Sequence, residues 1–290
     1  MTPAAAASLE GQVALVTGAG HGAARRAALE LGARGMMLAL AAESVEELDE
    51  VAAELEAGGG EALVVPADVT DRASVESLVA RVEGGLGPVD LLVTGPASHG
   101  PPLEFLAADP DRWWRTVELG VRGPALCSYF VLKRMMPRRR GRIVNLVGDW
   151  SLGPAPLLSE LACAEAAVLR LTDSLALAAW PAGVSVFAVS AGKVAVEAPA
   201  EPEGEGVERD PSGLEAAGRL VAELAGGIAD GLTGRFLQVG DDLGELLARS
   251  EEVEAEDVLQ LRLARLPPPA PEPPPEVAEP AGAPEARGAR

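Results

Sequence analysis

A glycine-rich turn near the N-terminus is the first group of residues whose types and spacing point to chemistry. It follows the apolar run Val13–Val16 and precedes an alanine-rich stretch that reaches about Gly35. Glycines let the backbone approach a ligand closely, and the free N–H groups that begin the next helix attract an anion. The sequence therefore predicts a phosphate cradle formed by Thr17, Gly18, Gly20, His21 and Gly22. A tight strand-to-helix connection without a ligand is the alternative for the turn taken alone.

The elements that must position this turn follow from the rest of the chain. Apolar runs alternate with helical patterns, which is typical of successive β–α–β units. We expect helices from Ser44, whose hydroxyl would form a capping box with Glu47, from about Asp71, and over about 110–136 and 158–180. We expect strands near 13–17, 36–41, 61–66, 89–94, 142–147, 184–189 and 234–239. Right-handed crossovers then predict a single-domain, doubly wound α/β fold, a parallel sheet of about seven strands flanked by helices.

Composition excludes several classes of function. The net charge of −20 opposes binding to a phosphate backbone, so no nucleic-acid partner is expected. No run approaches the length of a membrane span and residues 1–12 lack a signal-peptide core, which predicts a cytoplasmic protein. Cys127 and Cys163 fall in predicted helices and are expected to be buried thiols. His21 and His99 are the only histidines, so no metal site is expected.

Three segments are expected along the chain. Residues 1–8 form a flexible N-terminus, and residues 9–265 form the Rossmann-like domain. Residues 266–290 are rich in proline, alanine and glutamate and cannot build a core, so they are expected to form a disordered tail.

Several motifs give the chain a family resemblance. Thr17-Gly18-x-x-x-Gly22 is followed by Asp68-Val69, by Trp114 and by the two segments 141–145 and 231–235, Gly-Arg-Ile-Val-Asn and Gly-Leu-Thr-Gly-Arg. Together these motifs resemble the short-chain dehydrogenases/reductases, from about Leu9 to about Arg265. The resemblance implies a Rossmann fold, hydride transfer between a nicotinamide and a carbonyl or alcohol, and contact of Asp68 and Val69 with adenine.

The same resemblance implies a catalytic tetrad, and this sequence departs from it. Family members use Asn, Ser, Tyr and Lys, whose positions are held here by Gly120, Gly148, Leu161 and Glu165. Losing general acid catalysis alone costs about 10²–10⁴-fold in rate. We therefore expect a degenerate member, a pseudoenzyme that has lost hydride transfer. Tyr129 and Lys133 have the tetrad's YxxxK spacing, but they precede the fifth strand and are interpreted as structural.

The cofactor site is expected to be weakened. The resemblance implies Asp in NAD-preferring and Arg in NADP-preferring members near the end of the second strand, where this chain has Ala42 and Glu43. Glu43 would repel a 2′-phosphate. We expect that no dinucleotide is required or that NAD binds weakly, with NADP disfavoured. Glu43 contacts ribose hydroxyls in this interpretation, and merely starts a helix in the alternative.

Two carboxylates near the former chemistry are candidate proton-transfer groups, Glu165 and Asp149. A carboxylate facing a dry pocket has a raised pKa and can act as an acid or a base. In the alternative, Glu165 pairs with Lys193 or faces water. The segment 197–212 is short, acidic and rich in proline, which makes it a poor lid over an apolar ligand.

These observations leave three hypotheses on function. The first is non-redox chemistry on a small-molecule ligand in a biosynthetic pathway, such as a cyclisation, elimination or isomerisation. The second is a catalytically silent partner that binds a nucleotide or stabilises an active relative. The third is an atypical NAD-dependent oxidoreductase. Under all three we expect a homo-oligomer, or a hetero-oligomer with a relative, formed through the helices over 110–136 and 158–180.

Overall fold

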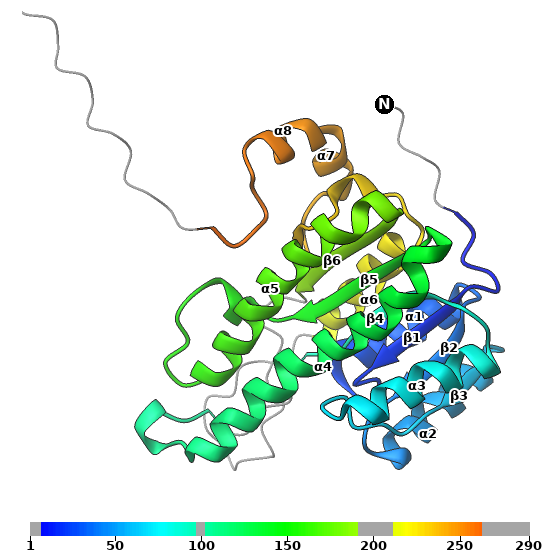
Figure 1. The fold of residues 1–290 in the computed structure, drawn as a ribbon, viewed down its shortest axis with the longest axis horizontal. Helices are drawn as coiled ribbons and strands as arrows, with labels where there is room; N and C mark the ends of the chain where they lie inside the picture. The colour runs from blue at the N-terminus through cyan, green and yellow to red at the C-terminus, as the bar shows by residue number, and fades with distance from the viewer. Residues whose placement is uncertain (1–6, 97–101, 191–210, 263–290) are drawn as a thin grey trace, which may run out of the picture.

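The computed structural model describes residues 7–96, 102–190 and 211–262. The described residues contain a parallel sheet of seven strands in the order β3-β2-β1-β4-β5-β6-β7 (Figure 1). The strands are β1 (Val13–Thr17), β2 (Met37–Ala41), β3 (Ala62–Val64), β4 (Val89–Thr94), β5 (Gly141–Val147), β6 (Val184–Ser190) and β7 (Phe236–Gln238). The predicted doubly wound α/β fold is confirmed.

Helices cover both faces of the sheet. The longer helices are α1 (Gly22–Ala33), α2 (Val45–Ala57), α3 (Arg72–Gly85), α4 (Pro110–Arg138), α5 (Ser159–Ala179) and α6 (Pro211–Ala225). The short helices α7 (Leu243–Ala248) and α8 (Ser250–Ala255) follow β7. One core cluster joins the sheet to α1, α2 and α6, and a second joins the opposite face to α3, α4 and the end of α5.

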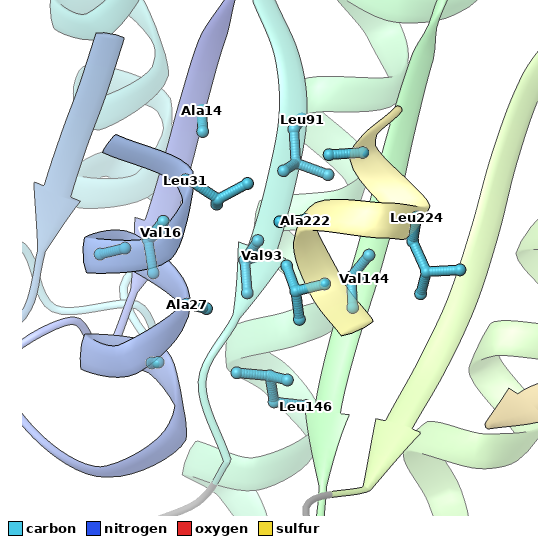
Figure 2. Packing of buried hydrophobic residues seen from close by; sticks show 14 of the residues in the cluster. Ala14, Val16, Ala27, Leu31, Leu91, Val93, Val144, Leu146, Ala222 and Leu224 are labelled. Carbon is cyan, nitrogen blue, oxygen red and sulfur yellow. The ribbon is translucent and has the colours of Figure 1, made fainter. Parts of the chain in front are cut away.

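The first core shows why small and branched aliphatic residues dominate this sequence. Side chains of α1 and α6 lie against the strands β1, β4 and β5 (Figure 2). Ala27 and Ala222 are fully or almost fully buried, so each helix approaches the sheet closely, and Leu31 and Leu224 fill the space that remains. A buried strand in a parallel sheet is apolar on both faces, and β1 is buried at every residue.

Side-chain caps fix the starts of several helices. Ser44, Asp71, Asp109 and Asp242 each accept a hydrogen bond from the backbone N–H three residues later, which satisfies one free donor of α2, α3, α4 and α7. The capping box at α2 is only half formed. Ser44 accepts from the Glu47 N–H at 3.3 Å, but the Glu47 carboxylate turns away to Gly20, and Glu46 approaches the Ser44 hydroxyl instead.

Two strands are shorter than expected. β3 covers 62–64 rather than 61–66, although the Val65 and Ala67 N–H groups still donate to the carbonyl oxygens of Leu40 and Ala42 at 2.9 and 3.0 Å. Pro66 lies between these two donors, at a position that does not donate toward β2, which is where an edge strand tolerates proline. β7 covers 236–238 rather than 234–239, because Gly234 has a φ of +83° and turns the chain. Within the part of the chain described, no helix is long and apolar enough to cross a membrane. The tail at 266–290 and most of residues 1–8 lie outside the described residues.

Candidate functional site

The glycine-rich turn lies at the carboxyl edge of the sheet, at the place where the order of the strands reverses. β1 pairs with β2 on one side and with β4 on the other, which makes this the topological switch point of the sheet. The Gly95 N–H after β4 donates to the Thr17 carbonyl oxygen at 3.0 Å, so the connections leaving β1 and β4 are tied together. Ligands of open α/β sheets bind in the crevice outside such a point.

The turn has the conformation that a phosphate cradle needs. Gly18 and Gly22 have φ angles of +63° and +58°, a region in which side chains with a Cβ are strained. Nothing lies within 4 Å of the place a Cβ would occupy at Gly22. α1 begins there with no capping hydrogen bond from the side chain of His21 and no acidic residue in its first turn. The residues present therefore fit a bound diphosphate.

The other residues predicted to contact a cofactor are Glu43, Asp68 and Val69, and the structure places two of them in contacts with neighbouring protein groups. Glu43 is exposed and precedes the N-cap of α2, so it does not start the helix. Asp68 is exposed, and its Oδ1 accepts from the N–H and the hydroxyl of Thr70, each at 2.7 Å. These bonds lower the pKa of Asp68 below its usual value. Val69 packs against Gly123 of α4, where a Cβ would lie 2.9 Å from the valine Cγ2.

Glu165 and Gly148 lie in contact. Gly148 directly follows β5 and is the N-cap residue of the 3₁₀ turn η2 (Asp149–Leu152). Its N–H donates to Glu165 Oε1 at 2.8 Å. Glu165 comes from α5 and is 4% exposed, so the carboxyl group lies beneath the turn rather than in water. A Cβ at position 148 would lie 3.1 Å from Oε1 and 3.4 Å from Oε2. The carboxyl group thus fills the space that a side chain at 148 would take.

The environment of Glu165 favours its protonated form. Burial is the main cause that raises the pKa of Glu165 to about 7, and the nearby charge of Asp149 raises it further. The backbone hydrogen bonds from Gly148 and Ser151 act in the opposite direction. Among the described residues Oε2 has no hydrogen-bond partner. Because Oε1 already accepts from Gly148, a proton is best placed on Oε2.

The carboxylate of Asp149 is held in place by residues that the sequence did not single out. Its Oδ1 accepts from the Ser190 hydroxyl at 2.7 Å and from the Gln238 side-chain amide at 2.9 Å. These residues end β6 and β7, so the carboxyl ends of three neighbouring strands converge on this group. Adjacent parallel strands end at the same edge of the sheet, which is the sequence signal that could have identified Ser190 and Gln238.

Other candidates lie apart from this pair. Leu161 is buried with Ala155 and Leu158, and Gly120 is buried in α4. The expectation of a buried Cys163 is wrong, because its face of α5 is exposed, whereas burial raises the pKa of Cys127 to about 12. The Lys133 ammonium lies 5.5 Å from the Tyr129 ring centroid, on an exposed part of α4. His99, Lys193 and the segment 197–210 lie outside the described residues.

The fold and this edge of the sheet define a dinucleotide-binding architecture, and comparison with known proteins gives the family. Residues 12–203 match the short chain dehydrogenase family. The chain belongs to the short-chain dehydrogenase/reductase family, as the motifs indicated.

Individual relatives resemble the chain over most of the domain. A short chain dehydrogenase of Pseudocercospora fijiensis is 32% identical over 65% of this chain, and the match spans only 62% of that relative. The cis-4-hydroxycyclohexanecarboxylate dehydrogenase of Sinomonas cyclohexanicum is 32% identical over 79% of this chain and 94% of its own length. The structure of NAD⁺-bound xylitol dehydrogenase is 25% identical, with a TM-score of 0.72 over 80% of this chain and 98% of that one.

The comparisons correct the expected function. The relatives are named as dehydrogenases, which points to redox function rather than to lost chemistry. The expectation of a pseudoenzyme with a non-redox role or a silent scaffolding role is therefore wrong. That expectation considered each aligned position by itself. It did not consider that the carboxyl group of Glu165, from α5, could occupy the space next to Gly148.

Proposed function

We propose that this protein is a nicotinamide-dependent oxidoreductase that interconverts a carbonyl compound and an alcohol, with Glu165 as the group that gives and takes the proton. The observation that carries the proposal is the buried carboxyl group of Glu165 against Gly148, with a pKa of about 7. A general acid or base works best when its pKa lies near the working pH. Family membership supports the redox half of the proposal.

The cofactor would be held by the turn at 17–22. The N–H groups at the start of α1 and the two left-handed glycines, Gly18 and Gly22, would bind the diphosphate. Glu43, exposed after β2, favours NAD over NADP. When bound, the nicotinamide supplies or accepts the hydride.

Glu165 completes the reaction by moving a proton. In reduction, the proton on Oε2 passes to the carbonyl oxygen of the substrate as that oxygen gains negative charge. In oxidation, ionised Glu165 takes the hydroxyl proton of the alcohol. Oε2 is buried, so the side chain must turn out from beneath η2 and give up the bond from Gly148, at a cost of about 0.5–1.5 kcal/mol.

Asp149 supports this role without moving a proton itself. Its two hydrogen bonds fix its position, and its charge disfavours a second negative charge on Glu165. Asp149 therefore supports the protonated form of Glu165 through its charge and its fixed position.

Turnover of NADH or NADPH with a panel of ketones and aldehydes tests the proposal. The wild-type protein should oxidise NADH with at least one member of the panel, and Glu165→Gln should lower kcat by about 10²–10⁴-fold. Glu160→Gln is the matched control, because Glu160 is also a buried carboxylate of α5 but contacts the Ser159 hydroxyl, whereas the Gly148 N–H donates to Glu165. Equal turnover in Glu165→Gln and wild type would refute the role of Glu165, and no turnover with any pair would refute the redox function.

A further inference from the structure

A small corner beside the glycine turn is built by three elements. The Ala19 N–H donates to the carbonyl oxygen of Ala41 at 3.3 Å, so the turn lies against the end of β2. The carboxylate and the Cβ of Glu47, from the first turn of α2, lie directly against Gly20. Glu43, which is exposed, follows β2 two residues after Ala41. Two exposed carboxylates therefore border the turn that would hold the diphosphate.

The position of the Glu47 side chain is not explained by helix capping. The backbone N–H of Glu47 satisfies the Ser44 cap, whereas its carboxylate leaves the helix terminus for Gly20. Within the described ranges no hydrogen bond or ion pair joins this carboxylate to a cation. Only glycine fits at position 20, because a Cβ there would collide with the Glu47 side chain. The Glu47 carboxylate therefore lies against the turn without a paired cation among the described residues.

We propose that Glu47 is a specificity-determining residue that excludes nucleotides with a phosphate on the ribose 2′ oxygen. This proposal rests on the proposed function. When a diphosphate binds at the start of the helix after β1, the adenosine ribose lies near the residues that follow the next strand, about 20 positions further on. In this chain those residues are Glu43 and, one helical turn later, Glu47.

The physical cause is repulsion between like charges. A phosphate monoester carries about −1.5 to −2 charges at neutral pH, whereas the ribose hydroxyl is neutral and can donate to a carboxylate. The corner is exposed, so screening by water limits the effect of each carboxylate to about tenfold in affinity for the phosphorylated ligand. Glu47 acts beside Glu43, and the two effects should be separable by substitution.

Equilibrium binding of NADH and NADPH to the full-length protein, measured by titration calorimetry, tests this role without turnover. Adenosine 5′-monophosphate and adenosine 2′,5′-bisphosphate serve as further probes, because they report on the adenosine half alone. Glu47→Gln should tighten binding of NADPH and of the bisphosphate about tenfold, with less than threefold change for NADH and the monophosphate. Asp49→Asn is the matched control: it removes the same charge from an exposed residue of α2 that faces away from Glu47.

The outcomes separate this inference from the function on which it rests. If wild type binds NADH, and Glu47→Gln changes NADPH binding no more than Asp49→Asn does, the role of Glu47 is refuted and the oxidoreductase proposal stands. If neither dinucleotide binds to wild type or to any variant, the proposed function itself fails. Thermal melting of each variant confirms that the fold is kept, and Glu47→Ala provides a second substitution with the same expected selectivity.

Discussion

At Gly148 a side chain would have to share its space with the carboxyl group of Glu165, because a Cβ would lie 3.1 Å from Oε1 and 3.2 Å from Trp150 Cδ1. Alignment alone treats the glycine and the glutamate as two separate departures from the family tetrad. In the structure they are joined by the hydrogen bond from the Gly148 N–H. The sequence could place both residues near the carboxyl end of β5, but not show that one fills the place left by the other.

The raised pKa of Glu165 predicts a dependence of stability on pH. In the folded protein the pKa is about 7, compared with the ordinary value of 4.5, so the folded state holds a proton that the unfolded state has released between these values. The contribution of Glu165 to the free energy of unfolding is therefore fully present below pH 4.5 and is lost as pH rises to about 7. The loss amounts to roughly 3 kcal/mol.

Urea denaturation between pH 4.5 and 8 measures this effect as the difference between wild type and Glu165→Gln, which cancels the titration of the other groups. Wild type should lose stability relative to the variant as pH rises toward 7, and the difference should then level off. A difference that stays constant over the whole range would show that Glu165 titrates normally in the folded protein.

On the scale of the secondary structure, a buried chain of hydrogen bonds holds α5 at its place on the sheet. Asn145 of β5 accepts from the Thr94 hydroxyl of β4 at 2.8 Å, and its amide donates to the Thr172 hydroxyl of α5 at 2.9 Å. All three side chains are almost completely buried. This chain fixes the helix that carries Glu165 with respect to the strand that leads to Gly148.

Thr172→Val should lower the free energy of unfolding by about 1–3 kcal/mol, because valine keeps the shape of threonine but leaves a buried amide donor of Asn145 unpaired. Chemical denaturation gives this value. Ser174→Ala, which removes an exposed hydroxyl from the same helix, should change stability by less than about 0.5 kcal/mol. Similar values for the two variants would mean that Asn145 finds another partner and that the chain does not hold α5.

The elements could be predicted from sequence more reliably than their side-chain contacts. The apolar run at 13–17 gave the correct strand, because burial on both faces of a parallel sheet leaves a clear pattern. Glu47 follows the capping-box spacing, yet its carboxylate lies against Gly20, since a tertiary contact replaced the local one. Cys163 lies on a largely apolar helix but on its exposed side, and no local pattern separates the two faces of such a helix.

On the scale of the whole molecule, α4 and α5 lie side by side on one face of the sheet (Figure 1). They and the turn after α5 expose large apolar side chains, namely Tyr129, Met136, Leu177 and Trp180. Leu177 is 81% exposed, which is unusual for a leucine in a helix that packs on a core. We expect that a second copy covers this surface.

Light scattering at micromolar concentration should therefore give a mass at least twice the 29.7 kDa of one chain. Leu177→Arg places a charge on the expected contact surface and should shift the protein toward the monomer without unfolding it, because the side chain is exposed. Leu106→Arg is the matched control, because it adds the same charge at an exposed leucine that lies outside α4 and α5. A monomeric wild-type protein would rule out this surface as a self-association site.

The central claim is that Glu165 is the proton donor of a carbonyl reduction, and the pH dependence of single-turnover hydride transfer tests it most directly. Stopped-flow absorbance of NADH, with a carbonyl substrate identified from the panel, gives the rate between pH 5.5 and 9. The rate of reduction should be constant below the pKa of Glu165, about 7, and should fall about tenfold per pH unit above it, while the slow reaction of Glu165→Gln should show no such fall. A wild-type rate that is independent of pH over this range, or a variant with the same profile as wild type, would contradict the claim.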